Sequence, residues 1–576
     1  MPLRFSSEND YEWTIRKVAV VGPGIVGMPM AAMLAHAGIR IGQSDPAKVV
    51  VLQRDSPTSG WKVGAINAGK SPIGGIEPDL DRVVAETVRD GVLSASHDYA
   101  AAADADVILI CVQTDKKGFE PDYGPLMSAL DGIASALASS RPAGNVPLIV
   151  FESTLAPSTM ATIIKDHFAR HGLLEGKDVL LGNSPNRVMP GRLVERVMSS
   201  DKIVAGLHPL TPKLIHRLYS LIVTGGTLHA TNSMTAEVVK TLENAYRDVR
   251  IAFAAEIVRW CDAHDVDFFA LRESVNTEIA QSDAASSDAN AVPSGGVLVP
   301  TVGVGGHCLP KDGILLWWRK LESKQDTSRS LILESRTIND ESPRETLRLL
   351  EGLIGNVTSR KIALMGTAYR FNSEDTRNSP TLTLGKLLLE RGAEVVLHDP
   401  YVKGDDQNLL RYGLEKYFTQ DANAALSGAA AAVFCVGHRV YMGDGLRDML
   451  AMPSAPGAVV DGCNLYRAMD FRGTPIRYTG IGRGQKAPSP ALVAFVTESF
   501  RIMETGLANE LDSLIGFLND RFASGSFNQV QLSEVRRIAG TCVTGCAIGT
   551  PGAVSRVPEH EGFSLRLVRR AAGVPI

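Results

Sequence analysis

Cys308 lies in a turn whose composition is typical of a reactive thiol. The surrounding run is Gly305-Gly306-His307-Cys308-Leu309-Pro310-Lys311-Asp312, so a cation follows the cysteine by three residues and a carboxylate by four. A nearby cation favours the thiolate, which is the nucleophilic form of cysteine, and adjacent glycines let the backbone approach a ligand closely. The run predicts a cysteine nucleophile, and the alternative is a buried cysteine in a Gly/Pro loop.

A glycine-rich turn near the N-terminus predicts a dinucleotide site. An apolar run over residues 17–21 leads into Gly22-Pro23-Gly24-Ile25-Val26-Gly27, and residues 28–38 have a helical pattern that ends at a glycine. In a strand, G-x-G-x-x-G turn and helix, the backbone approaches a pyrophosphate at the helix N-terminus. We therefore expect Gly22, Gly24, Ile25, Val26 and Gly27 to contact the cofactor.

An acidic residue further along predicts which cofactor binds. Residues 39–42 are expected to form a second strand that leads to Asp45, 18 residues after Gly27. A carboxylate about 20 residues after the glycine turn accepts a hydrogen bond from the adenosine ribose. Because this acid would repel a 2′-phosphate, Asp45 favours NAD over NADP.

Two further apolar runs end in polar residues. Residues 106–112 are followed by Gln113-Thr114-Asp115, and residues 146–151 are followed by Glu152-Ser153-Thr154. Side chains directly after parallel strands lie at the carboxyl edge of the sheet, where ligands bind in doubly wound folds. We expect both polar triplets to lie at this ligand-binding edge.

Together these motifs resemble the nucleotide-sugar 6-dehydrogenases, the superfamily of UDP-glucose, GDP-mannose and UDP-N-acetylhexosamine dehydrogenases. The matches cover about residues 15 to 485. Besides the turns above they include runs at residues 66–73, 184–191, 236–247 and 375–380. The resemblance implies an α/β fold with two Rossmann-like doubly wound domains joined by a central helical domain with a long helix. A mostly helical C-terminal appendage would follow.

The resemblance also implies a reaction, the four-electron oxidation of a C6 alcohol to an acid with two NAD consumed per product. Cys308 would add to the intermediate aldehyde and carry a thiohemiacetal and then a thioester. Lys240 and Asn244, spaced i, i+4 on one helix face, would stabilise oxyanions or move protons, and Asp312 would tune that lysine or take part in proton transfer. A solvated helix face is the alternative for Lys240 and Asn244.

The resemblance assigns further residues to ligands. Thr114, Thr154 and Lys311 would contact the cofactor. The residues that would bind the substrate are Arg187, Arg247, Gly305, Arg370 and Arg377. Of these, Arg377 would contact a phosphate or the sugar.

One departure affects the last chemical step. The family usually has a glutamate where Asn186 stands, and that acid is implicated in activating the hydrolytic water. An amide cannot act as a base, so either thioester release is slow or Glu152 substitutes.

The substrate stays open between two branches. Gly305–Cys308 and residues 187–191 resemble the N-acetylhexosamine branch, whereas residues 309–312 resemble the UDP-glucose and GDP-mannose branches. We favour a UDP-N-acetylhexosamine, oxidised as a precursor of an acidic polysaccharide, with UDP-glucose as the alternative. Two other classes are a Rossmann dehydrogenase that performs a single two-electron step and a catalytically impaired nucleotide-sugar-binding homologue.

Composition excludes several partners. The 576 residues suggest three or four domains, and a net charge of −4 gives no basic surface for nucleic acid. Because no apolar run reaches about 18 residues, we expect no membrane insertion. The 7 cysteines are scattered, which predicts a cytoplasmic protein, and Cys542 and Cys546 lack the partners of a metal site, so no metal is expected. We expect a homodimer or higher homo-oligomer.

Four domains are expected along the chain. An NAD-binding domain spans 1–215, a central helical domain with the catalytic Lys and Cys loop spans 216–335, and a UDP-binding α/β domain spans 336–485. Residues 486–576 lie outside the resemblance, and their apolar stripe predicts a helix that docks on the third domain or on a partner subunit, dispensable for chemistry. The stripe consists of Leu492, Phe495, Met503, Leu507, Leu511, Leu514 and Leu518.

Overall fold

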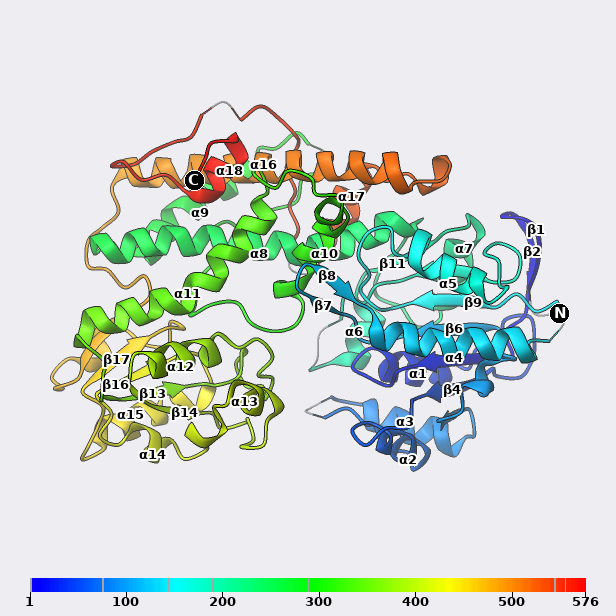
Figure 1. The fold of residues 1–576 in the computed structure, drawn as a ribbon, viewed down its shortest axis with the longest axis horizontal. Helices are drawn as coiled ribbons and strands as arrows, with labels where there is room; N and C mark the ends of the chain where they lie inside the picture. The colour runs from blue at the N-terminus through cyan, green and yellow to red at the C-terminus, as the bar shows by residue number, and fades with distance from the viewer. Residues whose placement is uncertain are drawn as a thin grey trace. The chain divides into compact units, whose positions relative to one another are not determined.

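A computed structural model gives the fold (Figure 1). It describes residues 3–74, 77–142, 144–188, 191–288, 290–542, 545–554 and 556–576. The chain divides into two compact units, the first comprising residues 1–243, 315–325 and 512–546, and the second residues 244–314, 326–511 and 547–576. Each is a mixed α/β unit, which confirms the predicted fold class. Among the described residues no helix is both long and apolar enough to cross a membrane.

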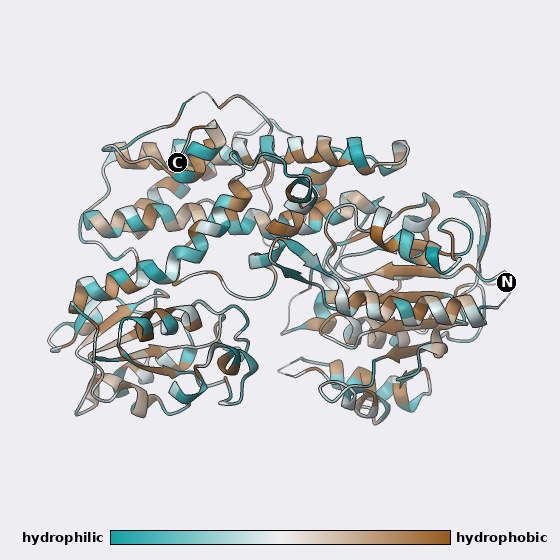
Figure 2. Ribbon diagram, viewed as in Figure 1, coloured by the Kyte–Doolittle hydropathy of each residue, from teal (hydrophilic) through white to brown (hydrophobic). Residues whose placement is uncertain are grey.

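The first unit is built on an eight-stranded sheet of order β12-β11-β10-β9-β6-β3-β4-β5, parallel except where β10 meets β11. Alternate residues of β3, β4, β6, β9 and β10 enter two separate cores, one on each face, and Figure 2 shows the central strands of this sheet as strongly apolar. Its strands are β3 Lys17–Val21, β4 Lys48–Leu52, β5 Leu93–Ser96, β6 Val107–Ile110, β9 Leu148–Phe151, β10 Leu180–Asn183, β11 Lys202–Gly206 and β12 Leu228–Asn232.

Helices cover both faces of this sheet, as the two cores require. One core takes α1 Gly27–His36, α3 Leu80–Arg89, α6 Leu193–Ser199 and α7 Leu210–Tyr219, and the other takes α4 Gly124–Ser140 and α5 Lys165–Arg170. Smaller elements are α2 Trp61–Asn67 and the hairpins β1 Leu3–Ser7 with β2 Asp10–Trp13, and β7 Asp115–Lys117 with β8 Glu120–Asp122. The unit is therefore doubly wound.

The second unit contains a six-stranded, all-parallel sheet of order β15-β14-β13-β16-β17-β18. Its strands are β13 Lys361–Met365, β14 Glu394–His398, β15 Phe418–Thr419, β16 Ala431–Phe434, β17 Ala458–Asp461 and β18 Arg477–Gly480. Its helices are α12 Pro380–Glu390, α13 Gln407–Tyr412, α14 Ala422–Leu426 and α15 Asp444–Ala451. This confirms a second Rossmann-like domain.

Further helices, several of them long, make up the rest. The predicted long central helix is α8 Ser233–His264, which contributes residues to both units, as does α16 Pro490–Phe522. The others are α9 Phe268–Ala284, α10 Leu309–Glu322, α11 Leu331–Ile354, α17 Leu532–Ala539 and α18 Arg566–Ala572. All seven residues of the predicted C-terminal stripe are buried, so the amphipathic helix is confirmed.

Buried carboxylates join the C-terminal extension to the central helices of the second unit. Glu510 of α16 accepts hydrogen bonds from Ser330 Oγ at 2.6 Å and Leu331 N at 2.8 Å, and so caps α11. Conversely, Glu256 of α8 accepts from Arg566 N at 2.8 Å at the start of α18. These bonds satisfy backbone N–H groups that a helix start leaves unpaired. Residues 486–511 and 547–576 of the extension are thus part of this unit's packing.

Candidate active site

The glycine turn has the backbone that a pyrophosphate site needs. Gly22 has φ +91°, which favours glycine, and a Cβ on Gly27 would lie 2.2 Å from Gly22 O. A Cβ on Gly24, in contrast, would meet no described atom within 4 Å. The three glycines therefore serve a tight turn, open approach to a ligand and close helix packing, the three roles of the dinucleotide fingerprint. Ile25 and Val26 complete the turn, and Val26 precedes the first residue of α1.

The predicted second strand is wrong, and so is the predicted role of Asp45 as the residue that contacts the ribose. Residues 39–42 are not a strand, and the strand beside β3 is β4, paired so that Lys17 faces Lys48 and Val21 faces Leu52. Asp45 precedes Lys48, at the amino edge of the sheet, whereas Gly22 follows β3 at the carboxyl edge. The carboxylate after β4 is Asp55, an exposed residue that the expected offset missed. Asp55 therefore lies at the carboxyl edge of the sheet, where the dinucleotide fingerprint requires its acid.

The two polar triplets lie together, as expected from the parallel pairing of β6 with β9. Thr114 is buried, and its Oγ1 donates to Thr154 O at 2.7 Å. Strand β6 also pairs with β3, so Thr114 follows the strand next to the glycine turn. This is where the strand order reverses, and doubly wound folds bind ligands at that reversal.

Glu152 is the centre of a buried network. Its Oε2 lies 2.6 Å from Lys202 Nζ, its Oε1 accepts from Tyr219 OH at 2.5 Å, and its side chain is 0% exposed. Burial raises the pKa of Tyr219 well above its ordinary value, and the Glu152 carboxylate raises it further, so the phenol stays a donor. Both carboxylate oxygens are therefore engaged, which argues against Glu152 as the base that activates water.

Asn186 is also occupied locally. Its Nδ2 donates to Val188 O at 3.0 Å and its Oδ1 accepts from Val188 N at 3.3 Å. Met189 and Pro190 of the same motif lie outside the described residues. The side chain thus fixes the turn of this segment and supplies no base.

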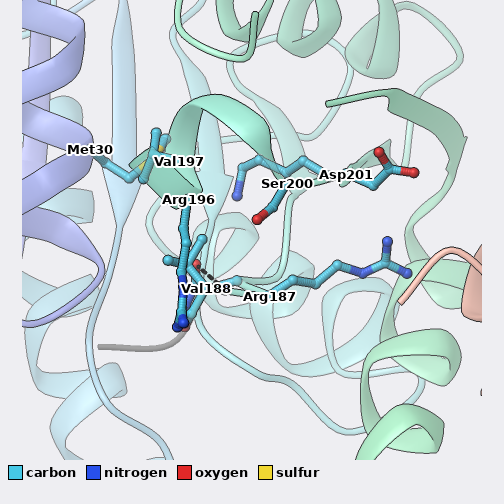
Figure 3. Close-up of a pocket in the computed structure, with 9 residues that line it drawn as sticks. Met30, Arg187, Val188, Arg196, Val197, Ser200 and Asp201 are labelled. Carbon is cyan, nitrogen blue, oxygen red and sulfur yellow. Dashed lines mark hydrogen bonds between the residues drawn. The ribbon is translucent and has the colours of Figure 1, made fainter. Parts of the chain in front are cut away.

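Arg187 is held by a residue of α8 and by the C-terminal extension. Its Nη2 bonds Glu243 Oε1 at 2.5 Å and Ile538 O at 2.9 Å, and its Nη1 donates to Thr541 Oγ1 at 3.0 Å. Figure 3 shows the side chain extending away from Arg196, which lines the same small cavity of about 10 Å³. Such a volume holds about one water. The extension therefore supplies two partners of a predicted substrate-binding residue.

Lys240 and Asn244 lie four residues apart in α8, as predicted. Lys240 is 9% exposed. Asn244 Nδ2 donates to Asp312 Oδ2 at 2.6 Å, and Lys311 Nζ lies 2.8 Å from Asp312 Oδ1 without the alignment of a hydrogen bond. Asp312 is 0% exposed, and these partners offset the cost of burying its carboxyl group. Three predicted residues, Asn244, Lys311 and Asp312, thus form one cluster within the second unit.

Cys308 is exposed and lies at the start of α10. Its carbonyl accepts from Lys311 N and Asp312 N at 3.0 and 2.9 Å, so it opens the helix. The N-terminus of a helix favours a negative charge, and a thiolate at Cys308 would gain from it. The geometry therefore matches a nucleophile better than a buried structural cysteine.

The cysteine loop is fastened to the second sheet's domain. Gly306 N donates to Arg377 O at 2.8 Å, and Asn378 Nδ2 donates to Gly306 O at 2.9 Å. A Cβ on Gly306 would lie 2.9 Å from the ring of Tyr369, and one on Gly305 would lie 2.5 Å from Tyr369 Cβ. The two glycines are needed because Tyr369 packs on the loop, a contact that no local pattern predicted.

The remaining predicted arginines lie in the second unit. Arg377 Nη2 pairs with Asp375 at 2.6 Å, and this hydrogen bond raises the pKa of Arg377 further. Arg370 stacks 5.7 Å from the ring of Phe371, which is 58% exposed. Arg247 is half-buried on α8, three residues after Asn244.

The fold and the glycine turn together define an NAD-binding dehydrogenase with two doubly wound domains. Three models of the UDP-glucose/GDP-mannose dehydrogenase family match in order: its NAD binding domain over residues 16–223, its central domain over 234–341 and its UDP binding domain over 363–468. The chain belongs to this family, and is an NAD-dependent nucleotide-sugar dehydrogenase.

Similar proteins agree with this placement. The chain is 30% identical over 481 residues to the UDP-N-acetyl-D-mannosamine dehydrogenase of Pyrococcus horikoshii, covering 81% of this chain and 99% of that protein. It is 30% identical over 435 residues to the NDP-N-acetyl-D-galactosaminuronic acid dehydrogenase of Ralstonia nicotianae, covering 74% and 92%. The crystal structure of the NDP-N-acetyl-D-galactosaminuronic acid dehydrogenase from Methanosarcina mazei Go1 superposes with a TM-score of 0.68 at 29% identity, covering 82% of this chain and 96% of that one.

Proposed function

We propose that this enzyme oxidises the C6 alcohol of a UDP-N-acetylhexosamine to the uronic acid. The observation that carries the proposal is Cys308, an exposed thiol at the start of a helix, on a loop hydrogen-bonded to Arg377 and Asn378 of the UDP-binding domain. An alcohol dehydrogenase that stops at the aldehyde has no use for such a thiol. A second oxidation does, because the aldehyde carries no transferable hydride until a nucleophile has added to it.

The residues have separate roles in this scheme. The glycine turn would hold NAD, which would supply the hydride acceptor for each oxidation. Cys308 Sγ adds to the aldehyde carbon and forms a thiohemiacetal, and loss of hydride from that carbon leaves a thioester. Water then attacks the thioester carbon, the C–S bond breaks, and the Cys308 thiolate leaves with the acid released. Lys240 stabilises the negative charge on the substrate oxygen, which is an alkoxide in these steps.

Asp312 is proposed to position Asn244. Its Oδ2 accepts from Asn244 Nδ2 at 2.6 Å, which fixes the amide plane and leaves the second N–H of that amide available to a substrate oxygen. Lys311 Nζ lies 2.8 Å from the other carboxyl oxygen of Asp312 and helps to hold that side chain in place. The same cluster ties α8 to α10, the helix that begins at the nucleophile.

Hydrolysis of the thioester is proposed to be the slow step. Asn186 cannot remove a proton from water, and Glu152 is held by Lys202 and Tyr219. Water must then attack without a strong base, and base assistance is worth about 10²–10⁴ in rate. A thioester on Cys308 is therefore expected to accumulate during turnover.

The relatives' names support the choice of substrate class. Two of them are dehydrogenases of N-acetylated sugar nucleotides. UDP-glucose remains the second candidate, favoured by the resemblance of residues 309–312. We propose that the product feeds an acidic polysaccharide, and that the enzyme is a cytoplasmic homodimer or higher homo-oligomer.

The roles of the chain's parts complete the proposal. Residues 1–215 bind NAD, 216–335 carry Lys240 and Cys308, and 336–485 bind the UDP group through Arg377 and Arg370. Arg187, Arg247 and Gly305 are proposed to meet the sugar.

Replacing the nucleophile tests the proposal. Cys308→Ala should abolish acid formation from UDP-N-acetylglucosamine and its manno epimer, and Cys308→Ser should leave at most aldehyde-level chemistry because an alkoxide is a worse leaving group than a thiolate. Cys542→Ser is the matched control, with unchanged flux. Mass spectrometry of the sugar product separates acid from aldehyde. Near wild-type acid from either Cys308 variant would make the thiol structural, and activity on UDP-glucose alone would refute the substrate choice.

A further inference from the structure

Three ligand-type side chains converge on the helices that cover one face of the first sheet. Asp131 comes from α4, while His167 lies in α5 and His171 follows its last residue. One ligand atom of each lies within 4.8 Å of the others. Asp131 Oδ1 is 3.5 Å from His167 Nε2 and 4.0 Å from His171 Nε2. The histidines are four residues apart and so share a face of the helical segment.

The buried histidine of this cluster has an unused nitrogen. The His167 side chain is 6% exposed, and among the described residues no atom hydrogen-bonds to its Nε2. An unsatisfied polar atom in such a place is costly unless something binds it. An imidazole nitrogen without a hydrogen-bond partner is available to coordinate a metal ion.

The distances suit a small metal ion. Metal–ligand distances of 2.0–2.1 Å in tetrahedral geometry place ligand atoms roughly 3.3 Å apart. The 3.5 Å between Asp131 Oδ1 and His167 Nε2 fits this spacing directly. The 4.0 Å between Asp131 Oδ1 and His171 Nε2 would shorten to it if either side chain moved slightly, and these side chains are 65% and 31% exposed. The open side toward solvent leaves room for water as a further ligand. Arg170, in the same helix as His167, would oppose a cation, so the site relies on the carboxylate of Asp131 for negative charge.

We propose that Asp131, His167 and His171 bind one divalent transition-metal ion, with Zn²⁺ the best fit. Two imidazole nitrogens and one carboxylate oxygen suit Zn²⁺, Co²⁺ or Ni²⁺, whereas Mg²⁺ and Ca²⁺ select all-oxygen sites. The ion would tie α4 to α5 and stabilise the first unit. None of the three residues belongs to the proposed chemistry, so the role is structural.

A titration on the full chain tests this site. Cys308→Ala serves as the parent, because its exposed thiol would otherwise bind Co²⁺ and Zn²⁺. The metal-stripped parent should take up one Co²⁺ with the absorption of a tetrahedral site, and Zn²⁺ should displace it. Adding His171→Ala or Asp131→Asn should weaken binding at least about 100-fold, more than loss of an outer-shell partner costs. His216→Ala, an exposed histidine on α7, is the matched control and should bind like the parent.

A second readout separates binding from folding. Zn²⁺ should raise the unfolding temperature of the parent and of the His216→Ala protein, but not that of the His171→Ala or Asp131→Asn proteins. Both altered side chains are partly exposed, so the metal-free proteins should unfold within a few degrees of one another. The proposal is overturned if the parent shows no saturable binding, or if the two ligand variants bind as tightly as the control.

Discussion

Leu507 provides the most direct measure of how far the C-terminal extension contributes to the fold. It lies in α16 and is 0% exposed, as is Met503 one turn before it. Replacing a buried leucine by alanine removes its transfer free energy and leaves a cavity, together about 2–5 kcal/mol. Leu507→Ala should therefore lower the unfolding temperature by at least about 4 °C, since a large domain loses about 2 °C per kcal/mol.

The matched control is Glu498→Ala on the same helix. Glu498 is 35% exposed and pairs with Arg556, which is 72% exposed, and such surface pairs contribute at most about 1 kcal/mol. Thermal and urea unfolding of the two variants, followed by circular dichroism, make the comparison. Equal midpoints for Leu507→Ala and Glu498→Ala would refute the packing of α16 against the central helices.

Deleting the whole extension extends the same reasoning. The seven stripe residues, each worth about 1.5–3 kcal/mol when buried, sum to about 10–20 kcal/mol, against a typical total stability of 5–15 kcal/mol. A chain that ends near Gly482 should therefore fail to give a folded, monodisperse protein, although the sequence suggested that the extension is dispensable for chemistry. A soluble truncated enzyme with a near-normal melting temperature would contradict this account.

Three further predictions concern the cofactor, the hydrolysis step and pH. Asp55→Ala should raise KM for NAD at least about tenfold and weaken the enzyme's discrimination against NADP. Asp45→Ala should leave the initial-rate kinetics unchanged. The reverse pattern would show that Asp45 contacts the ribose. Asn186→Glu should speed single-turnover thioester hydrolysis by about 10² or more and Asn186→Gln should not, and equal rates in quenched-flow experiments would mean that another base acts. Burial raises the pKa of Glu256 to about 7, so its proton stabilises the fold below about pH 4.5 and that stability is lost as pH rises through 7. Glu256→Gln should thus remove about 3 kcal/mol of the fall in unfolding free energy between pH 4.5 and pH 8, and an unchanged urea-midpoint profile would count against the raised pKa.

Local patterns were enough to predict much of the site. The glycine turn, the strand before it and the helix after it are contiguous, so their periodicity and glycine spacing carry the signal. The resemblance linked Asp312 to Lys240, whereas the hydrogen bond in the structure joins it to Asn244, 68 residues away. No local pattern predicted that partner.

Other features could not be found from local patterns. Residues 39–42 have the pattern of a strand, and Asp45 follows them at nearly the expected offset. Only the sheet pairing of β4 shows that the acid after the true strand is Asp55. Arg187 and Thr541 are 354 residues apart, and no periodicity links them. Tyr369 contacts the cysteine loop through tertiary packing alone. Such contacts depend on how distant segments come together, which composition and spacing do not specify.

The ratio of NADH formed to uronic acid formed tests the central claim most directly. The enzyme should be incubated with NAD and a UDP-N-acetylhexosamine, NADH followed by absorbance, and the acid quantified by mass spectrometry at several times. A cysteine-dependent double oxidation predicts two NADH per acid, with a covalent thioester on Cys308 detectable by intact-protein mass. A ratio of one, with aldehyde as the product and no adduct on Cys308, would contradict the account.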